Sequence, residues 1–196
     1  MKALIVIDVQ NDFCPGGALA VPDGEVIVPG INALMDDFDA VILTQDWHPA
    51  GHSSFASTHN ADPMTMMDMP YGPQVLWPDH CVQGTHGALF HADLKTDRAD
   101  LIVRKGYNAS IDSYSAFFEN DQKTPTGLEG YLHTRGIRDL TLVGLATDFC
   151  VNYSAVDAAK LGFNVTVKTD LCRAIDFDGS LAAALNDMKQ AEVKVV

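Results

Sequence analysis

The segment Asp139-Leu-Thr-Leu-Val-Gly-Leu-Ala-Thr-Asp-Phe-Cys150 has the pattern of a buried strand, a short turn and the start of a helix. The expected strand covers residues 140–143 and ends at Gly144. The expected helix covers about 148–161, and one of its sides carries Val151, Ala155, Ala158, Ala159 and Leu161. A strand followed directly by an amphipathic helix is the repeating unit of α/β proteins.

The same pattern recurs along the chain. Short aliphatic runs predict further strands at 3–7, 40–44, 101–104, 164–168 and 193–196. Helical patterns cover about 26–38, 127–135 and 179–189. Continuous apolar strands separated by helices are typical of a parallel sheet that is covered on both faces, and right-handed crossovers favour a doubly wound arrangement. We therefore expect an α/β three-layer sandwich with a mostly parallel sheet of about six strands and helices on both faces.

Length and charge restrict the class of protein. A chain of 196 residues suits a single domain, which we place at 1–196. The formal net charge of −13 argues against nucleic acid or an anionic membrane surface as a partner. No apolar stretch reaches the roughly 20 residues of a membrane helix, and no export signal is recognisable. The four cysteines are widely spaced, so we expect reduced thiols and a cytoplasmic location.

Cys150 is the first candidate for chemistry. It falls in the first turn of the expected helix, at the carboxyl end of a strand. Unpaired backbone N–H groups and the positive end of the helix dipole favour the thiolate at such a position. A thiolate is a nucleophile, so Cys150 is a candidate catalytic residue. The alternative is a buried cysteine that acts only as a small apolar side chain.

Two further charged residues follow predicted strands. Asp8 comes after the strand at 3–7, and Lys105 comes after the strand at 101–104. If they converge with Cys150, Asp8 can take the thiol proton and Lys105 can lower the thiol pKa. Backbone N–H groups of the turn at 145–150 would then form an oxyanion hole. The alternatives are a turn-capping role for Asp8 and a solvated strand end for Lys105.

A long segment at about 46–91 lacks periodicity, and its residues 47–86 hold five of the seven histidines and both tryptophans. Long aperiodic segments in compact domains are usually functional. Within it, residues 60–74 contain four methionines at spacings that fit neither a helix nor a strand, which predicts a flexible apolar flap.

This segment also carries candidate metal ligands. Asp46 and His48 point the same way in an extended chain, and His80 is a third candidate. One carboxylate and two imidazoles suit catalytic zinc or non-haem iron. His52 lies nearby as a further candidate ligand, and Cys81 is expected to be structural. Loop histidines that bond only to backbone are the alternative.

With these residues identified, the chain resembles the nicotinamidases of the isochorismatase-like cysteine hydrolases. The resemblance runs from about residue 3 to 167 and rests on the following blocks: Ile7-Asp8-Val9-Gln10-Asn11-Asp12-Phe13, Gln45-Asp46-Trp47-His48-Pro49, Trp77-Pro78-Asp79-His80-Cys81-Val82, Arg104-Lys105-Gly106, Asp112-Ser113-Tyr114-Ser115-Ala116-Phe117 and Gly144-Leu-Ala-Thr-Asp-Phe-Cys150-Val151.

The resemblance implies roles for particular residues. It implies a triad of Asp8, Lys105 and Cys150. It implies a metal site at Asp46, His48 and His80. It also implies a cis peptide between Leu145 and Ala146, which turns the N–H groups of Ala146 and Cys150 toward the oxyanion. The candidate substrate-binding side chains are Phe13, Trp77 and Tyr114, although Phe13 could equally fill the core.

The implied activity is hydrolysis of nicotinamide to nicotinate and ammonia through a thioester, as in the salvage of NAD, with pyrazinamide as a second substrate. The implied cofactor is one divalent metal ion, zinc first and manganese or iron next, and a homo-oligomer is allowed. Three alternatives remain at this point: an isochorismatase-like amidohydrolase for another small amide, a non-haem metal oxygenase, and a thiol- or metal-sensing protein.

Overall fold

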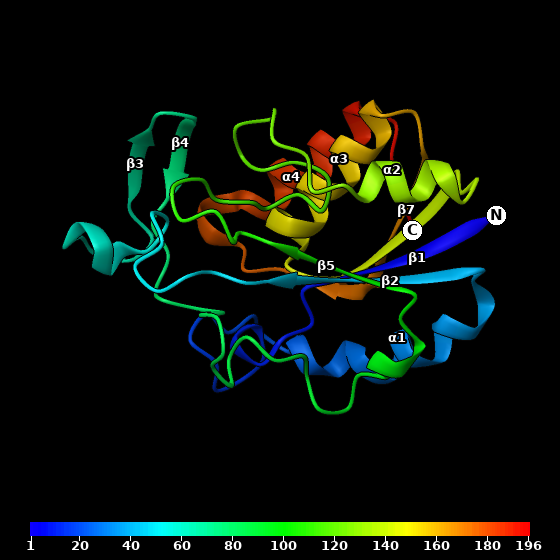
Figure 1. Ribbon diagram of the computed structural model, residues 1–196, viewed down its shortest axis with the longest axis horizontal. Helices are drawn as coiled ribbons and strands as arrows, with labels where there is room; N and C mark the ends of the chain where they lie inside the picture. The colour runs from blue at the N-terminus through cyan, green and yellow to red at the C-terminus, as the bar shows by residue number, and fades with distance from the viewer.

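The computed structural model describes residues 1–196 and is built around one six-stranded sheet (Figure 1). Every pairing in this sheet is parallel, and the strand order is β5-β2-β1-β6-β7-β8. The strands are β1 (Lys2–Ile7), β2 (Ala40–Asp46), β5 (Leu101–Lys105), β6 (Asp139–Leu145), β7 (Asn164–Arg173) and β8 (Lys194–Val195). The predicted sheet is thereby confirmed.

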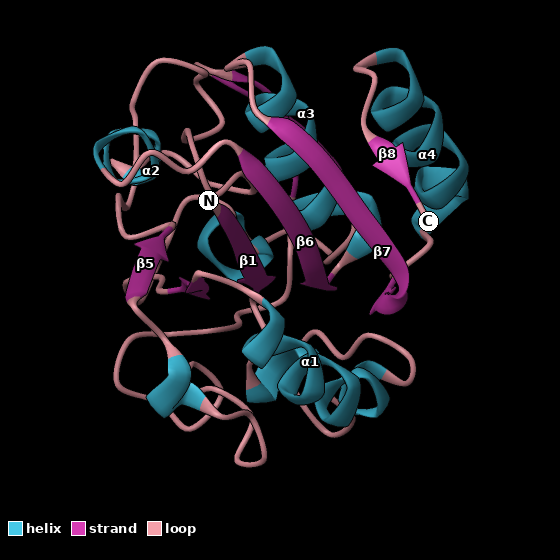
Figure 2. Cartoon of the chain, turned by 90° about the vertical axis from the view of Figure 1, so that its right-hand side faces the viewer, coloured by secondary structure: helices cyan, strands magenta, loops and turns pink.

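Helices cover both faces of the sheet (Figures 1 and 2). One face packs on α1 (Val28–Leu34), in a core that includes Val28, Ile31 and Met35. The other face carries α2 (Leu128–Thr134), α3 (Asn152–Lys160) and α4 (Ser180–Gln190). The structure is thus the predicted three-layer sandwich, and none of its helices is long and apolar enough to span a membrane.

Short 3₁₀ turns complete the helical elements. Two of them, Gly24–Ile27 and Met35–Asp37, flank α1, so the helix predicted over 26–38 is α-helical only in its middle. The others are Asn11–Phe13, Ala56–His59, Thr96–Arg98 and Phe177–Gly179.

β7 is longer than predicted because extra residues of β7 form a local irregularity, after which its pairing with β6 resumes. The register shifts between Leu142 and Gly144, after which Leu145 pairs with Arg173. Gly144 has φ +118°, and a Cβ at this position would lie 2.1 Å from the carbonyl oxygen of Ile7. Only glycine fits this close approach of β6 to β1.

The long segment after β2 contains a structure that the sequence did not indicate. β3 (Met66–Met69) and β4 (Gly72–Val75) form an antiparallel hairpin, which stands at the left end of the molecule in Figure 1. The expectation of a strandless flap at 60–74 is therefore wrong. Methionines occupy successive positions 66 and 67, so both faces of β3 carry apolar side chains and the two-residue alternation is hidden.

Candidate active site

The carboxyl ends of three strands bring the candidate catalytic side chains together. Asp8 follows β1, Lys105 ends β5, and Cys150 follows β6. The Lys105 Nζ lies 2.8 Å from Asp8 Oδ2 and 3.4 Å from Cys150 Sγ. All three side chains are buried. The predicted convergence of these residues is observed.

Asp8 is held by a residue that sequence reasoning missed. The hydroxyl of Thr44 donates to Asp8 Oδ1 at 2.6 Å and accepts the backbone N–H of Asp8 at 3.1 Å. Asp8 itself adopts the left-handed region with φ +48°, which turns the chain sharply at the end of β1. The available signal was that Thr44 lies two residues before Asp46 on a buried strand, on the same side.

Burial determines the protonation of this cluster. Burial raises the pKa of Asp8, and the adjacent Lys105 only partly opposes that rise. Burial also raises the pKa of Cys150 well above its ordinary value, against the attraction of Lys105 and with support from the neighbouring Asp8. The pKa of Lys105 is well above its usual value because Asp46 and Asp8 outweigh the effect of burial. The cluster therefore rests with a neutral thiol beside a charged ammonium group.

The helix N-terminus expected at Cys150 does not lower the pKa of the thiol, and the local backbone explains part of this. Residues Thr147–Val151 form a π-helical turn, and α3 begins only at Asn152. Cys150 therefore lies within this wider turn rather than in the first turn of an α-helix, and single π turns are frequent at functional sites.

A second cluster shares the Asp46 carboxylate. Oδ1 of Asp46 contacts Lys105 Nζ, whereas Oδ2 lies 3.5 Å from His48 Nε2 and 3.7 Å from His80 Nε2. Burial opposes the charge of Asp46, but Lys105 and His48 outweigh it and keep its pKa well below the usual value. The carboxylate is therefore ionised.

Both histidines are oriented for metal binding. His48 Nδ1 lies 2.9 Å from the carbonyl of Gly106, and His80 Nδ1 lies 2.8 Å from the carbonyl of Pro78. A carbonyl can only accept, so a proton on each Nδ1 leaves both Nε2 lone pairs facing Asp46. Metal-binding histidines are commonly fixed in this way. Asp46, His48 and His80 therefore fit a divalent metal ion, in agreement with the predicted ligand set.

Two side chains that sequence reasoning missed hold the backbone of the metal site. The Gln10 amide accepts from Asp46 N–H at 2.8 Å and donates to Asp46 C=O at 2.9 Å. The Asp12 carboxylate accepts the backbone N–H of Cys81 at 2.7 Å, directly after His80. Cys81 is buried and is not close enough to share an ion with the histidines.

His52 occupies a separate position. Its Nδ1 lies 2.8 Å from Ser54 Oγ, and its Nε2 lies 2.9 Å from the carbonyl of Asn108. Its ring centroid is 4.4 Å from that of His48. Its ligand atom lies close to those of His48 and Asp112, in a cluster that does not include Asp46. A ligand role for His52 stays a prediction.

The two clusters open into one small pocket of about 20 Å³. Phe13, Trp77 and Tyr114, the three candidate substrate-binding residues, all line it together with Cys150. The ring of Trp77 stands edge-on to Phe149, with centroids 4.8 Å apart. Sequence reasoning did not identify four further lining residues, Leu19, Asp112, Phe149 and Ile175.

Ala146 also borders this pocket. The peptide bond between Leu145 and Ala146 is cis, as the resemblance implied. Its neighbour in the turn, Phe149, donates its backbone N–H to the carbonyl of Ala146 at 3.1 Å.

Comparisons with known proteins agree with this geometry. The family model described as "Isochorismatase domain" matches residues 2–196. The nicotinamidase of Acinetobacter baylyi is 54% identical over 98% of this chain and 90% of its own length. The structure of the nicotinamidase pyrazinamidase of Acinetobacter baumanii has a TM-score of 0.98 at 54% identity, covering 100% of this chain and 95% of its own.

A third relative carries a metal. The structure of the pyrazinamidase of Pyrococcus horikoshii in complex with zinc has a TM-score of 0.80 at 35% identity, covering 100% of this chain and 98% of its own. The match extends over the sheet, the buried cysteine and the histidine-bearing segment alike, and we conclude that the chain belongs to the isochorismatase family.

Proposed function

We propose that this chain is a metal-containing cysteine amidohydrolase that converts nicotinamide to nicotinate and ammonia and also accepts pyrazinamide. One observation carries the proposal: the pocket that Cys150 lines is also lined by Asp46 and His80, and Lys105 contacts Asp8, Asp46 and Cys150. Asp46, His48 and His80 are arranged to hold a metal ion. The names of the similar proteins support the same activity.

In the first step, the ionised carboxylate of Asp8 takes the proton of the Cys150 thiol. Sγ and the carboxylate oxygens of Asp8 and Asp46 lie within 4.8 Å of one another, which is close enough for transfer after a small adjustment on substrate binding. Because burial raises the pKa of Cys150, the thiol stays neutral until Asp8 takes its proton. Lys105, 3.4 Å from Sγ, stabilises the negative charge during this step.

In the second step, the sulfur attacks the amide carbon and the carbonyl oxygen becomes an oxyanion. The backbone N–H groups of Ala146 and Cys150 are the proposed donors to this oxygen, and one such donor typically contributes about 3 kcal/mol. Asp8 then returns its proton to the amide nitrogen, ammonia leaves, and a thioester remains on Cys150. Asp8 then takes a proton from a water molecule, and the resulting hydroxide attacks the thioester carbon. The C–S bond breaks, Asp8 returns the proton to the Cys150 sulfur, and the released acid loses its proton to solvent to give nicotinate.

Asp46, His48 and His80 would hold the metal ion, which supplies a Lewis-acidic contact that orients the pyridine ring through its nitrogen. Zinc is the proposed ion because it accepts a carboxylate and two imidazoles and is present in a similar protein. Manganese and iron accept the same ligands. Phe13, Trp77 and Tyr114 would enclose the flat ring.

The decisive experiment is to incubate the purified protein with nicotinamide and to measure ammonia and nicotinate, with and without a chelator. Equal amounts of both products, lost on chelation and restored by zinc, are the expected result. Oxygen consumption instead would favour the oxygenase, and reversible metal binding without products would favour the sensor.

Three further statements stay predictions. The chain forms one domain over residues 1–196, it is cytoplasmic, and a homo-oligomer is allowed. Size-exclusion chromatography with light scattering tests the last of these. We predict no nucleic acid or membrane partner, because the formal net charge is −13.

A further inference from the structure

Gln74 is a buried polar residue that has no role in the proposed mechanism. It lies on β4 and has no exposed surface. Its Nε2 lies 2.8 Å from each of three acceptors: Asp112 Oδ2, the Tyr114 hydroxyl and the carbonyl of Val75. Its Oε1 accepts from Asn120 Nδ2 at 3.1 Å and from the Tyr71 hydroxyl at 3.3 Å.

These contacts continue to the wall of the active pocket. The Tyr114 oxygen also accepts a hydrogen bond from Trp77 Nε1 at 3.0 Å. An indole N–H can only donate, so the Tyr114 oxygen is fixed from two sides, by Trp77 and by Gln74. Trp77 and Tyr114 both line the pocket that contains Cys150. The orientation of this aromatic wall therefore depends on the Gln74 amide.

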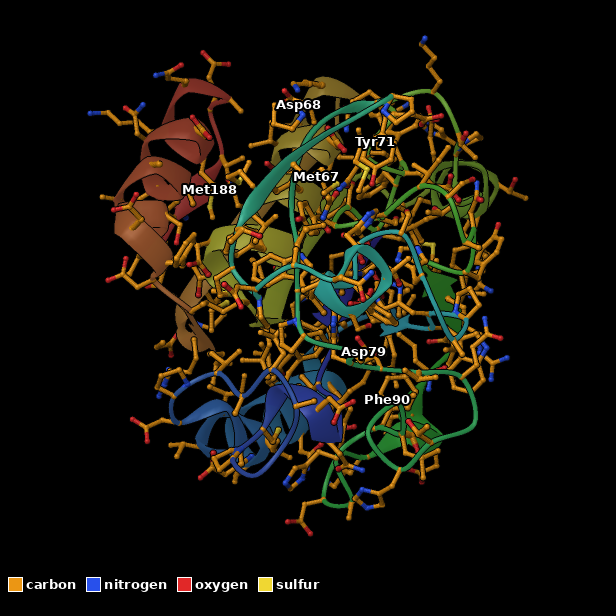
Figure 3. All side chains as sticks on the ribbon, turned by 90° about the vertical axis from the view of Figure 1, so that its left-hand side faces the viewer. Met67, Asp68, Tyr71, Asp79, Phe90 and Met188 are labelled. Atoms are coloured by element: carbon orange, nitrogen blue, oxygen red, sulfur yellow. The ribbon has the colours of Figure 1, made fainter.

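The same residues separate two spaces. On the far side of Tyr114 lies an open cleft of about 680 Å³, bordered by Tyr71, Asn120 and the face of α3 and α4. Tyr114 lines both this cleft and the active pocket. Figure 3 shows Tyr71 on the hairpin that carries Gln74. Tyr114 thus separates the open cleft from the pocket of the buried thiol, and Gln74 links Tyr114 to the hairpin.

We propose that Gln74 is a positioning residue: through the Tyr114 hydroxyl it fixes the Trp77–Tyr114 wall against which the substrate ring binds. This inference rests on the proposed function, because it assigns the wall to the ring of that substrate. The hydrogen bond from Gln74 to the Asp112 carboxylate is charge-assisted, which makes the amide a rigid anchor.

The inference predicts a particular kinetic change. A wall that contacts the ring equally in the ground state and in the transition state affects KM and not kcat. Gln74→Met preserves the length of the side chain and removes every hydrogen bond of the amide. We expect KM for nicotinamide to rise about two- to tenfold, the range of one net hydrogen bond, with kcat unchanged.

The test is a double-mutant cycle with Tyr114→Phe, which removes the shared oxygen. If Gln74 acts through Tyr114, the double variant has nearly the same KM as the more affected single variant. Asn32→Leu is the matched control. Asn32 on α1 holds Asp93 C=O and Lys95 N–H by its amide, on the opposite face of the sheet, so its loss should lower stability without changing KM.

Several outcomes would overturn the inference. One is an unchanged KM in Gln74→Met, and another is a KM in the double variant that equals the product of the two single effects. If Gln74→Met does not fold, Asn120→Asp replaces the donor to Gln74 Oε1 by a carboxylate oxygen and keeps an acceptor for the Tyr114 N–H, and it should raise KM in the same direction. Turnover of nicotinamide by the unmodified protein is measured first, so that a failure of the proposed function is distinguished from a failure of this inference.

Discussion

Lys105 is a buried ammonium group whose neighbours are two carboxylates and a thiol. It contacts Asp8, Asp46 and Cys150 and also donates to the carbonyl of Ser113 at 3.0 Å. A buried charge of this kind is stable only when it is paired on several sides. Its position lets one cation contact the proposed proton acceptor Asp8, the proposed nucleophile Cys150 and the proposed metal ligand Asp46.

Cys150→Ala tests the nucleophile. We expect kcat for ammonia release to fall at least about 10³-fold, because the covalent route is lost. Metal content, measured by elemental analysis, should not change, because Cys150 is not among the residues around the two histidine nitrogens. Appreciable turnover in this variant would contradict the assignment of Cys150.

The pH dependence follows from the raised pKa of Asp8. Asp8 must be ionised to accept the thiol proton, and burial raises its pKa above the ordinary value. As the pH falls through this raised pKa, Asp8 becomes protonated and kcat/KM should decline. We therefore expect the acid limb of the profile above the ordinary range of about pH 4 for aspartate. An acid limb at or below pH 4 would argue against Asp8 as the base.

At the scale of elements, the junctions between strands and loops position the residues of the site. These junctions were also the part of the chain that could best be predicted from the sequence. Strands buried on both faces give continuous apolar runs, so the ends of β1, β2, β5 and β6 were readable from the sequence. The sequence did not reveal the roles of three polar residues, Thr44, Gln10 and Gln74. Each of them bonds to a partner about 36 to 40 residues away, and no local pattern encodes such pairs. The extension of β7 depends on its register with β6, which is likewise not local.

The junction after β5 offers a test of the metal site. Gly106 has φ +67°, and a Cβ there would lie 2.4 Å from His48 Cε1. Gly106→Ala should displace the His48 ring and weaken zinc binding about 10- to 100-fold, the usual effect of disturbing the support of a ligand. Isothermal titration with zinc measures the change.

Gly136→Ala is the matched control for backbone strain. Gly136 has nearly the same φ, +66°, but nothing lies within 4 Å of an added Cβ. This variant should lose stability and keep its zinc affinity. Equal losses of affinity in both variants would show that strain, and not contact with His48, is responsible.

At the scale of the whole molecule, the metal should stabilise the fold. Its proposed ligands come from β2 and from the loops that follow, and their nitrogen lone pairs are aligned only in the folded chain. A ligand bound only by the folded state at 100 times its Kd adds about 2.7 kcal/mol of stability. For a chain of this size, we expect chelation to lower Tm by roughly 5–10 °C, measured by calorimetry.

His80→Ala provides the comparison for this measurement. Its Tm should be lower than that of the unmodified protein and should no longer respond to the chelator, because one ligand is missing. If the Tm of the unmodified protein did not change on removal of the metal, the proposal that the metal stabilises the fold would be contradicted.

The two oxygens of Asp46 have a consequence for redesign of this enzyme. One oxygen holds the cation beside the nucleophile, and the other faces the two histidines. Recognition of the substrate ring and the reactivity of the Cys150 sulfur therefore cannot be changed independently at Asp46. Replacing Asp46 in order to accept a ring without a nitrogen would also change the charge around Lys105 and the Cys150 sulfur. Substitutions that aim at other substrates are therefore better made at Phe13, Leu19 and Ile175 than at the proposed metal ligands.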